Sequence, residues 1–216
     1  MPFKHSCFIS YRHLNHKEPY IEWIVEALKR ELAQWVEQDV FRDVDHIDGG
    51  ALYNDELRLA LCRSVCMVVL YSPRYFHRNH SYCAREFLAM QRLEQHRREF
   101  LHNQDEHSKG LVIFIAIRGS GFIPSEIIDK RQIYNFEPYT LMSDMRRNPK
   151  FKADVRNIGE YIFNRCKVFE SIAGQHDLCA NCHGFMLPSE DDIQPLLENF
   201  KPRKAQFLWE STDERP

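Results

Sequence analysis

Residues Val65–Tyr71 read VCMVVLY, seven residues without a charged side chain. An uninterrupted apolar run of this length, closed by Pro73, is typical of a β-strand that is covered on both faces. Leu111–Ile117 (LVIFIAI) has the same character. Both runs are far shorter than the ~20 apolar residues that cross a bilayer. They predict two central strands of a buried sheet and no membrane segment.

Amphipathic segments separate the strand-like runs, which predicts strands alternating with helices. The other expected strands are Cys7–Tyr11, Asp39–Phe41 and Gln132–Phe136, and the expected helices are Pro19–Val36, Tyr53–Cys62, Ser81–Leu101 and Pro149–Phe169. We therefore expect an α/β fold, a flavodoxin-like five-stranded parallel sheet with helices on both faces, and a short C-terminal extension.

The regular pattern ends near Glu170. We expect residues 1–169 to form the main domain and residues 170–216 an extension that packs on it without supplying catalytic groups. A short helix at Asp192–Phe200 would carry an apolar set that is costly to expose: Ile193, Leu196, Leu197 and Phe200. Pro195 would be tolerated only in the first turn of that helix.

The charges nearly balance, with 29 Lys and Arg against 31 Asp and Glu, for a net charge of −2. Such a chain lacks the field that attracts polyanions, so we expect no direct contact with nucleic acid and none with a membrane. Arg97-Arg98 and Arg146-Arg147 are expected on solvated faces. No signal peptide is evident. The seven cysteines are an odd number in core-like segments, which predicts a reducing, cytoplasmic location in which most of the thiols pack as small hydrophobes.

In an open parallel sheet, ligands bind beyond the carboxyl ends of the strands where the strand order reverses, here between the first and third strands. The loops after these strands begin at Ser10 and Ser72. The second loop leads to a helix on which Tyr82 and Glu86 are four residues apart and share a face. An aromatic ring beside a carboxylate suits a ligand with a flat base and a sugar. A glutamate near a helix N-terminus is also common without any such role, because the helix dipole favours it.

Three motifs resemble the Toll/interleukin-1 receptor (TIR) domain family. Phe8–Arg12 (FISYR) resembles its first sequence box, and Val40–Leu52 resembles its second strand and BB loop. Ser72–Tyr75, followed by Tyr82–Glu86 (YCARE), resembles its aromatic-Cys-x-x-Glu signature. The resemblance covers about residues 3–169 and implies the TIR fold.

The resemblance also implies a function, that of the bacterial-type enzymatic members, in which the Glu of this signature is essential. Glu86 would then be the catalytic residue, and no metal would be needed. The implied substrate-binding residues are Tyr82, where bacterial members commonly have Trp, and Ser10, Tyr11, Arg12, Arg42, Asp43 and Asp45. The implied activity is an NAD⁺ glycohydrolase that releases nicotinamide and ADP-ribose or a cyclic isomer, in signalling or antiphage defence. NAD⁺ would be the substrate and not a cofactor.

Other functions stay open at this stage. A non-enzymatic adaptor would act by TIR–TIR association, although animal adaptors usually lack the Glu. A nucleoside deoxyribosyltransferase can share this sheet and a Glu near a sugar, but the BB-loop resemblance argues against it. The resemblance further implies self-association through the BB loop, Arg42–Leu52, and an activating partner.

One further pattern concerns metal binding. Cys179 and Cys182, with His176 or His183, have ligand types that suit zinc. Because only one Cys-x-x-Cys pair is present, an ordinary loop is the favoured interpretation.

Overall fold

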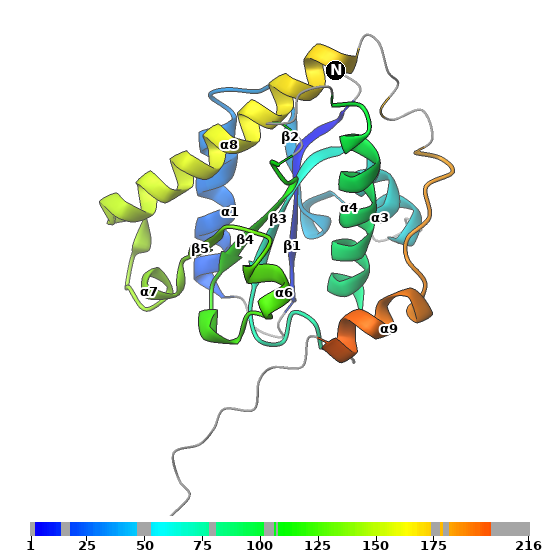
Figure 1. The fold of residues 1–216 in the computed structure, drawn as a ribbon. Helices are drawn as coiled ribbons and strands as arrows, with labels where there is room; N and C mark the ends of the chain where they lie inside the picture. Colours follow the sequence, from blue (N-terminus) through cyan, green and yellow to red (C-terminus); the bar gives the residue numbers. More distant parts are fainter. Residues whose placement is uncertain are drawn as a thin grey trace, which may run out of the picture.

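A computed structural model describes residues 3–13, 18–46, 53–77, 81–101, 106, 108–173, 178 and 182–199, and the backbone alone of Val44, Tyr53 and Asn199. Within these ranges the core is a five-stranded parallel sheet of order β2-β1-β3-β4-β5 (Figure 1). The strands are β1 (His5–Tyr11), β2 (Asp39–Phe41), β3 (Ser64–Tyr71), β4 (Val112–Ala116) and β5 (Ile133–Asn135). The predicted fold class is confirmed, because the five expected strands pair in parallel in the flavodoxin-like order.

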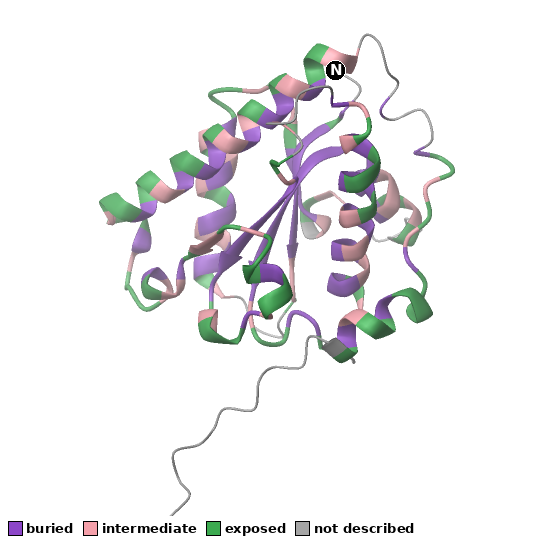
Figure 2. Cartoon of the chain, in the orientation of Figure 1, coloured by how far each residue is buried: buried purple, intermediate pink, exposed green. Residues whose placement is uncertain are grey.

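Helices cover both faces of the sheet. Helices α1 (Pro19–Leu32) and α8 (Pro149–Ala173) pack together on one face, and α3 (Tyr53–Cys62) and α4 (Tyr82–Arg98) cover the other (Figure 1). Every residue of β3 is buried (Figure 2). The lack of alternation in its sequence therefore follows from burial on both faces. None of the helices in the described ranges is long and apolar enough to cross a membrane.

Several short helical turns lie in segments for which the sequence predicted no helix: α2 (Asp43–His46), α6 (Ser125–Ile128), α7 (Glu137–Thr140), η1 (Ser120–Phe122) and η2 (Met145–Arg147). Elements of three or four residues are too short to show a helical repeat of apolar positions. The turn before η1 requires glycine, because Gly119 has φ 64° and a Cβ there would collide with Pro73. Glu137 then accepts hydrogen bonds from the amides of Gly119 (3.0 Å) and Ser120 (3.2 Å).

Arg97 corrects the expectation that the Arg97-Arg98 pair is solvated. Arg97 lies in the last turn of α4, and its side chain is 1% exposed. Its guanidinium donates to the carbonyls of Cys62 (2.7 Å), Ser64 (2.8 Å) and Val65 (3.2 Å). These carbonyls lie where α3 gives way to β3, so the buried charge is compensated by three backbone acceptors.

The extension contributes α9 (Glu190–Asn199), which packs on α4 (Figure 1). Ile193 and Leu197 are buried in this contact. Polar groups hold it as well: Arg92 pairs with Asp192 (2.7 Å), and Arg85 Nε donates to the carbonyl of Pro188 (2.8 Å). The extension is therefore fastened along the outer surface of the helix that carries Tyr82 and Glu86.

Pro195 lies past the first turn of α9, contrary to expectation. The helix starts earlier than predicted because Ser189 and Asp192 form a capping box. Ser189 Oγ accepts from the Asp192 amide (3.2 Å), and Asp192 Oδ2 accepts from the Ser189 amide (2.8 Å). The cap and the buried apolar face offset the backbone hydrogen bond that Pro195 removes.

Two cysteines differ from the majority that were expected to pack as thiols: Cys62 and Cys182 form a disulfide with Cα atoms 5.6 Å apart. The bond joins the end of α3 to the extension. Its two cysteines are separated by 120 residues in the sequence, so no local motif predicts that they pair. The other four cysteines in the described ranges are free and buried, as expected of thiols that act as small hydrophobes: Cys7, Cys66, Cys83 and Cys166.

Replacing Cys182 with Ser is expected to lower the free energy of unfolding by about 2–5 kcal/mol, since the bond closes a long loop in the unfolded chain. Thermal or denaturant unfolding of the oxidised protein measures this change. Cys62→Ser should have a similar effect, and the double variant should be no less stable than either single variant. A strictly additive double variant would show that the two side chains act separately.

Candidate functional site

A cavity of about 210 Å³ lies at the carboxyl ends of β1 and β3. These strands are neighbours in the sheet although β2 follows β1 in the chain, so the cavity occupies the predicted point of strand-order reversal. It is lined by Tyr11, Arg12, His13, Asp43, Tyr82, Cys83 and Glu86. The segments that follow β1, β2 and β3 thus each contribute to its wall.

Glu86 is the buried carboxylate of this cavity, with 6% of its surface exposed. Ser10 Oγ donates to Glu86 Oε2 at 2.5 Å, and the Tyr75 hydroxyl lies 2.5 Å from Ser10 Oγ. Burial raises the pKa of Glu86 to about 8, although the hydrogen bond from Ser10 acts in the opposite direction; the nearby charge of Asp43 raises it further. Burial in this site therefore favours a protonated Glu86 carboxyl group near neutral pH.

Local structure explains how these groups meet. Ser10 is the next-to-last residue of β1 and is fully buried. Tyr75 lies in the turn after β3, where its amide donates to the carbonyl of Ser72 (2.8 Å). Burial raises the pKa of the Tyr75 hydroxyl well above its ordinary value, so it remains a donor. The three side chains form a relay in which Tyr75 donates to Ser10 and Ser10 donates to Glu86.

Tyr82 and Glu86 lie one helical turn apart on α4, as predicted, and both line the cavity. They differ in exposure: Tyr82 is 46% exposed and Glu86 is buried. The ring is therefore at the mouth of the cavity and the carboxylate at its floor. A flat group that stacked on Tyr82 would extend inward toward Glu86.

Arg12 supplies a positive charge to the wall. Its Nη1 donates to the carbonyl of Arg74 at 3.3 Å. Its Nε is buried and has no hydrogen-bond partner among the described residues. Tyr11, one residue earlier, is partly buried, and its ring stacks on that of His13 with centroids 4.7 Å apart.

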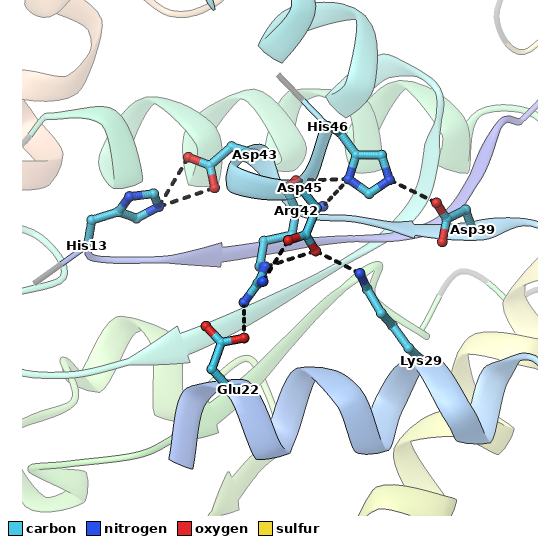
Figure 3. Close-up of polar contacts among 8 residues, drawn as sticks. All are labelled: His13, Glu22, Lys29, Asp39, Arg42, Asp43, Asp45 and His46. Carbon is cyan, nitrogen blue, oxygen red and sulfur yellow. Dashed lines mark hydrogen bonds and ion pairs between the residues drawn. The ribbon is translucent and has the colours of Figure 1, made fainter. Parts of the chain in front are cut away.

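The predicted wall residues of the BB loop separate into two groups. Asp43 faces the cavity, where both of its oxygens approach His13 (Figure 3). Arg42 and Asp45 instead pair with each other (2.6 Å) and with α1, Arg42 through Glu22 (2.8 Å). Lys29 completes this second group by donating to Asp45 (2.7 Å).

The separation follows from α2. Two residues apart on a helix, Asp43 and Asp45 point about 200° away from each other, so one turns to the cavity and the other to α1. Of the three implied binding residues in this segment, the structure therefore places Asp43 in the cavity wall and the side chains of Arg42 and Asp45 against α1. Residues 47–52, the remainder of the predicted BB loop, lie outside the described residues.

Sequence reasoning assigned no role to three side chains at this site: His13, Tyr75 and Cys83. His13 follows the first strand and was expected beside the pocket, but in a chain with eleven histidines such a neighbour is unsurprising. Its partner Asp43 is thirty residues away, so no local pattern marks the pair. Tyr75 belongs to the Ser72–Tyr75 motif, which was the available signal. Cys83 lies between Tyr82 and Glu86 and is buried against the cavity wall.

Two residues of the possible zinc site, His176 and Cys179, lie outside the described residues. Cys182 is bonded to Cys62, so its sulfur is not available as a thiolate ligand in this state. Among the described residues, no three His, Cys, Asp or Glu side chains are grouped so as to hold a metal ion.

A larger groove of about 870 Å³ lies elsewhere, near the amino ends of β4 and β5. It also contains a buried carboxylate, Glu94, but Arg131 pairs with it at 2.6 Å. Glu86, by contrast, has a hydroxyl group against its carboxylate. The groove contains none of the predicted site residues and lies at the end of the strands where ligands seldom bind.

Comparison with known protein families gives a match to the chain. A family model for the TIR domain matches residues 7–132. The match extends from β1 to the residue before β5 and includes every residue that lines the 210 Å³ cavity. No curated protein sequence matches the chain. Because the match spans more than half of the chain and the five strands have the expected order, the chain belongs to the TIR domain family.

Proposed function

We propose that the chain is an NAD⁺ glycohydrolase in which Glu86 is the catalytic residue. The TIR domain family includes both NADases and adaptors. The observation that carries the proposal is the buried carboxyl group of Glu86 at the floor of a cavity that has Tyr82 at its mouth. Ser10 Oγ donates to Glu86 Oε2 at 2.5 Å and holds this group in place. An adaptor surface has no need of such a group, whose burial is costly.

One carboxylate is enough for the bond-breaking step of this reaction. The nicotinamide of NAD⁺ is bonded to ribose as a pyridinium cation and leaves as a neutral base, so no acid is required to protonate it. Positive charge develops on the ribose, as in other glycoside cleavage. A carboxylate fixed beside the ribose stabilises that charge in the transition state. Bound cationic substrate also favours the ionised form of Glu86, because an opposite charge nearby lowers the pKa of a carboxyl group.

The cavity fits only the reacting end of the substrate. Its volume of about 210 Å³ is below the ~300–1,000 Å³ of ordinary ligand pockets. We place the nicotinamide against Tyr82, the ribose beside Glu86 and the diphosphate near Arg12. The adenosine half then lies outside the cavity, where a neighbouring molecule can contact it.

The second candidate is a non-enzymatic adaptor. The raised pKa of Glu86, about 8, favours it, because a neutral carboxyl group is a cheaper occupant of a purely structural site. TIR domains generally self-associate through TIR–TIR contacts, and an adaptor would use only this property. The two candidates differ in one observable, the release of nicotinamide.

The proposed NADase activity would depend on how the protein assembles. We infer that self-association through the BB loop, Arg42–Leu52, or an activating partner completes the pocket around the exposed half of the substrate. The protein would then act as a bacterial-type cytoplasmic effector in signalling or antiphage defence, giving ADP-ribose or a cyclic isomer. In that compartment, thiol reductants would compete with the Cys62–Cys182 disulfide.

The direct test is to incubate the purified protein with NAD⁺ and to measure free nicotinamide from nanomolar to tens of micromolar protein. Specific activity is expected to rise with protein concentration, in step with oligomers seen by light scattering. A flat specific activity from a monomer would contradict the role of assembly. Absence of nicotinamide at every concentration, despite oligomers, would favour the adaptor.

A further inference from the structure

His13 and Asp43 form an imidazole–carboxylate pair in the wall of the cavity that contains Glu86. His13 Nε2 lies 3.2 Å from Asp43 Oδ1 and 3.1 Å from Asp43 Oδ2 (Figure 3). His13 follows the end of β1, and Asp43 is the first residue of α2, directly after β2. Because β1 and β2 are adjacent in the sheet, the pair is built by the same strand ends that build the cavity.

The contacts determine which ring nitrogen is free to act. A carboxylate only accepts hydrogen bonds, so Nε2 carries the proton and donates to Asp43. In the neutral imidazole, Nδ1 is then an acceptor. Stacking on Tyr11 fixes the plane of the ring. The His13 side chain is 48% exposed and that of Asp43 only 12%, so the ring meets water while its partner is held in place.

We propose that His13, oriented by Asp43, is the general base that accepts a proton from the water attacking the ribose during NAD⁺ cleavage. This inference rests on the proposed function. The C1′–N bond breaks, and its electron pair leaves with nicotinamide. The water oxygen bonds to C1′, and its proton passes to Nδ1 of His13 and then to solvent, so no further reactant is needed. His13 is catalytic in this step, and Asp43 is a positioning residue.

A second group is needed because Glu86 cannot perform both tasks at once. Glu86 stabilises the transition state through its negative charge. It would lose that charge if it took the proton from water. Its Oε2 is already occupied by Ser10. With His13 at the exposed part of the wall, the two tasks fall to different residues. Glu86 stabilises the charge at the floor of the cavity, and His13 removes the proton where water enters.

The chemistry supplies a test that isolates proton removal. A neutral pyridine such as 3-acetylpyridine also attacks C1′, but its ring nitrogen bears no proton and forms a new pyridinium. Base exchange therefore requires Glu86 but no general base, whereas hydrolysis requires both. The ratio of exchange to hydrolysis at a fixed pyridine concentration reports on the base alone.

His13→Gln is expected to raise this ratio by roughly 10²-fold, since general base catalysis contributes typically 10²–10⁴-fold. Exchange itself should persist, which also demonstrates an intact fold and site. Asp43→Asn should move the ratio in the same direction by less. His96→Gln, the same change at an exposed position near the end of α4, is the matched control and should leave the ratio unchanged.

An unchanged ratio in His13→Gln, with exchange and hydrolysis both retained or both reduced equally, would overturn the role of His13 while leaving the NADase proposal intact. If the wild-type protein gave neither exchange nor hydrolysis at concentrations where it assembles, the proposed function would fail and this inference with it. The two failures are therefore distinguished by the wild-type protein.

Discussion

Glu86→Gln is expected to lower the rate of nicotinamide release by roughly 10²–10³-fold, which corresponds to a loss of ~3–4 kcal/mol of transition-state stabilisation. Gln keeps the shape of the side chain and its hydrogen bond with Ser10 but removes the charge. NAD⁺ binding should weaken far less, because most of the positive charge on the ribose arises as the bond breaks. Single-turnover assays and a separate binding measurement distinguish the two effects.

Two controls show whether the lower rate of nicotinamide release comes from the missing charge at Glu86 and not from a damaged fold. Glu99→Gln makes the same change at the exposed end of the same helix and should leave the rate unchanged. Glu86→Gln should also be at least as stable as the wild type at pH 8, because it removes a buried acid. A Glu86→Gln protein that released nicotinamide at nearly the wild-type rate would contradict the enzymatic interpretation of this site.

The second large effect is the dependence of kcat/KM on pH. Because burial raises the pKa of Glu86 to about 8 and the ionised form is the active one, kcat/KM should fall about tenfold for each pH unit below that value. The profile of kcat should have a lower midpoint, since the bound cation favours the carboxylate. Initial rates from pH 6 to 9 in one buffer series measure both, and a flat kcat/KM profile would show that Glu86 is already ionised.

The same pKa shift predicts a stability difference with a definite sign. A folded-state pKa above the unfolded value means that protonation favours the folded state, and that contribution is lost as pH rises from about 4.5 to about 8. The wild type should therefore lose stability relative to Glu86→Gln across this window. Melting temperatures of the two proteins at pH 5 and pH 8 make the comparison.

The two central strands were predictable because each is a short apolar run with helical segments on either side. Val65–Tyr71 is buried along its whole length, and complete burial removes alternation from the sequence itself. Helix ends were less predictable. Ser189 and Asp192 start α9 earlier than its apolar residues indicate, and short turns such as α2 are set by polar contacts and not by periodicity.

The candidate site was predictable where its residues form a local motif. Tyr82 and Glu86 share one turn of a helix, and Ser10 lies next to the end of a strand. The contacts that sequence reasoning missed join residues far apart in the chain, as His13 does with Asp43 and Cys62 with Cys182. Arg97 was misjudged for a related reason: a charged residue is normally exposed, and only the fold brings three carbonyl groups to its guanidinium.

The position of α9 limits how this TIR domain can associate. The extension occupies the outer surface of α4, where Arg85 and Arg92 hold it and where Ile193 and Leu197 are buried. A neighbouring molecule that approached this side would first have to displace a segment tied covalently to α3 through Cys62. While the disulfide is intact, the part of α4 beneath α9 is therefore covered, and a second molecule of this protein could not contact that part of α4 directly.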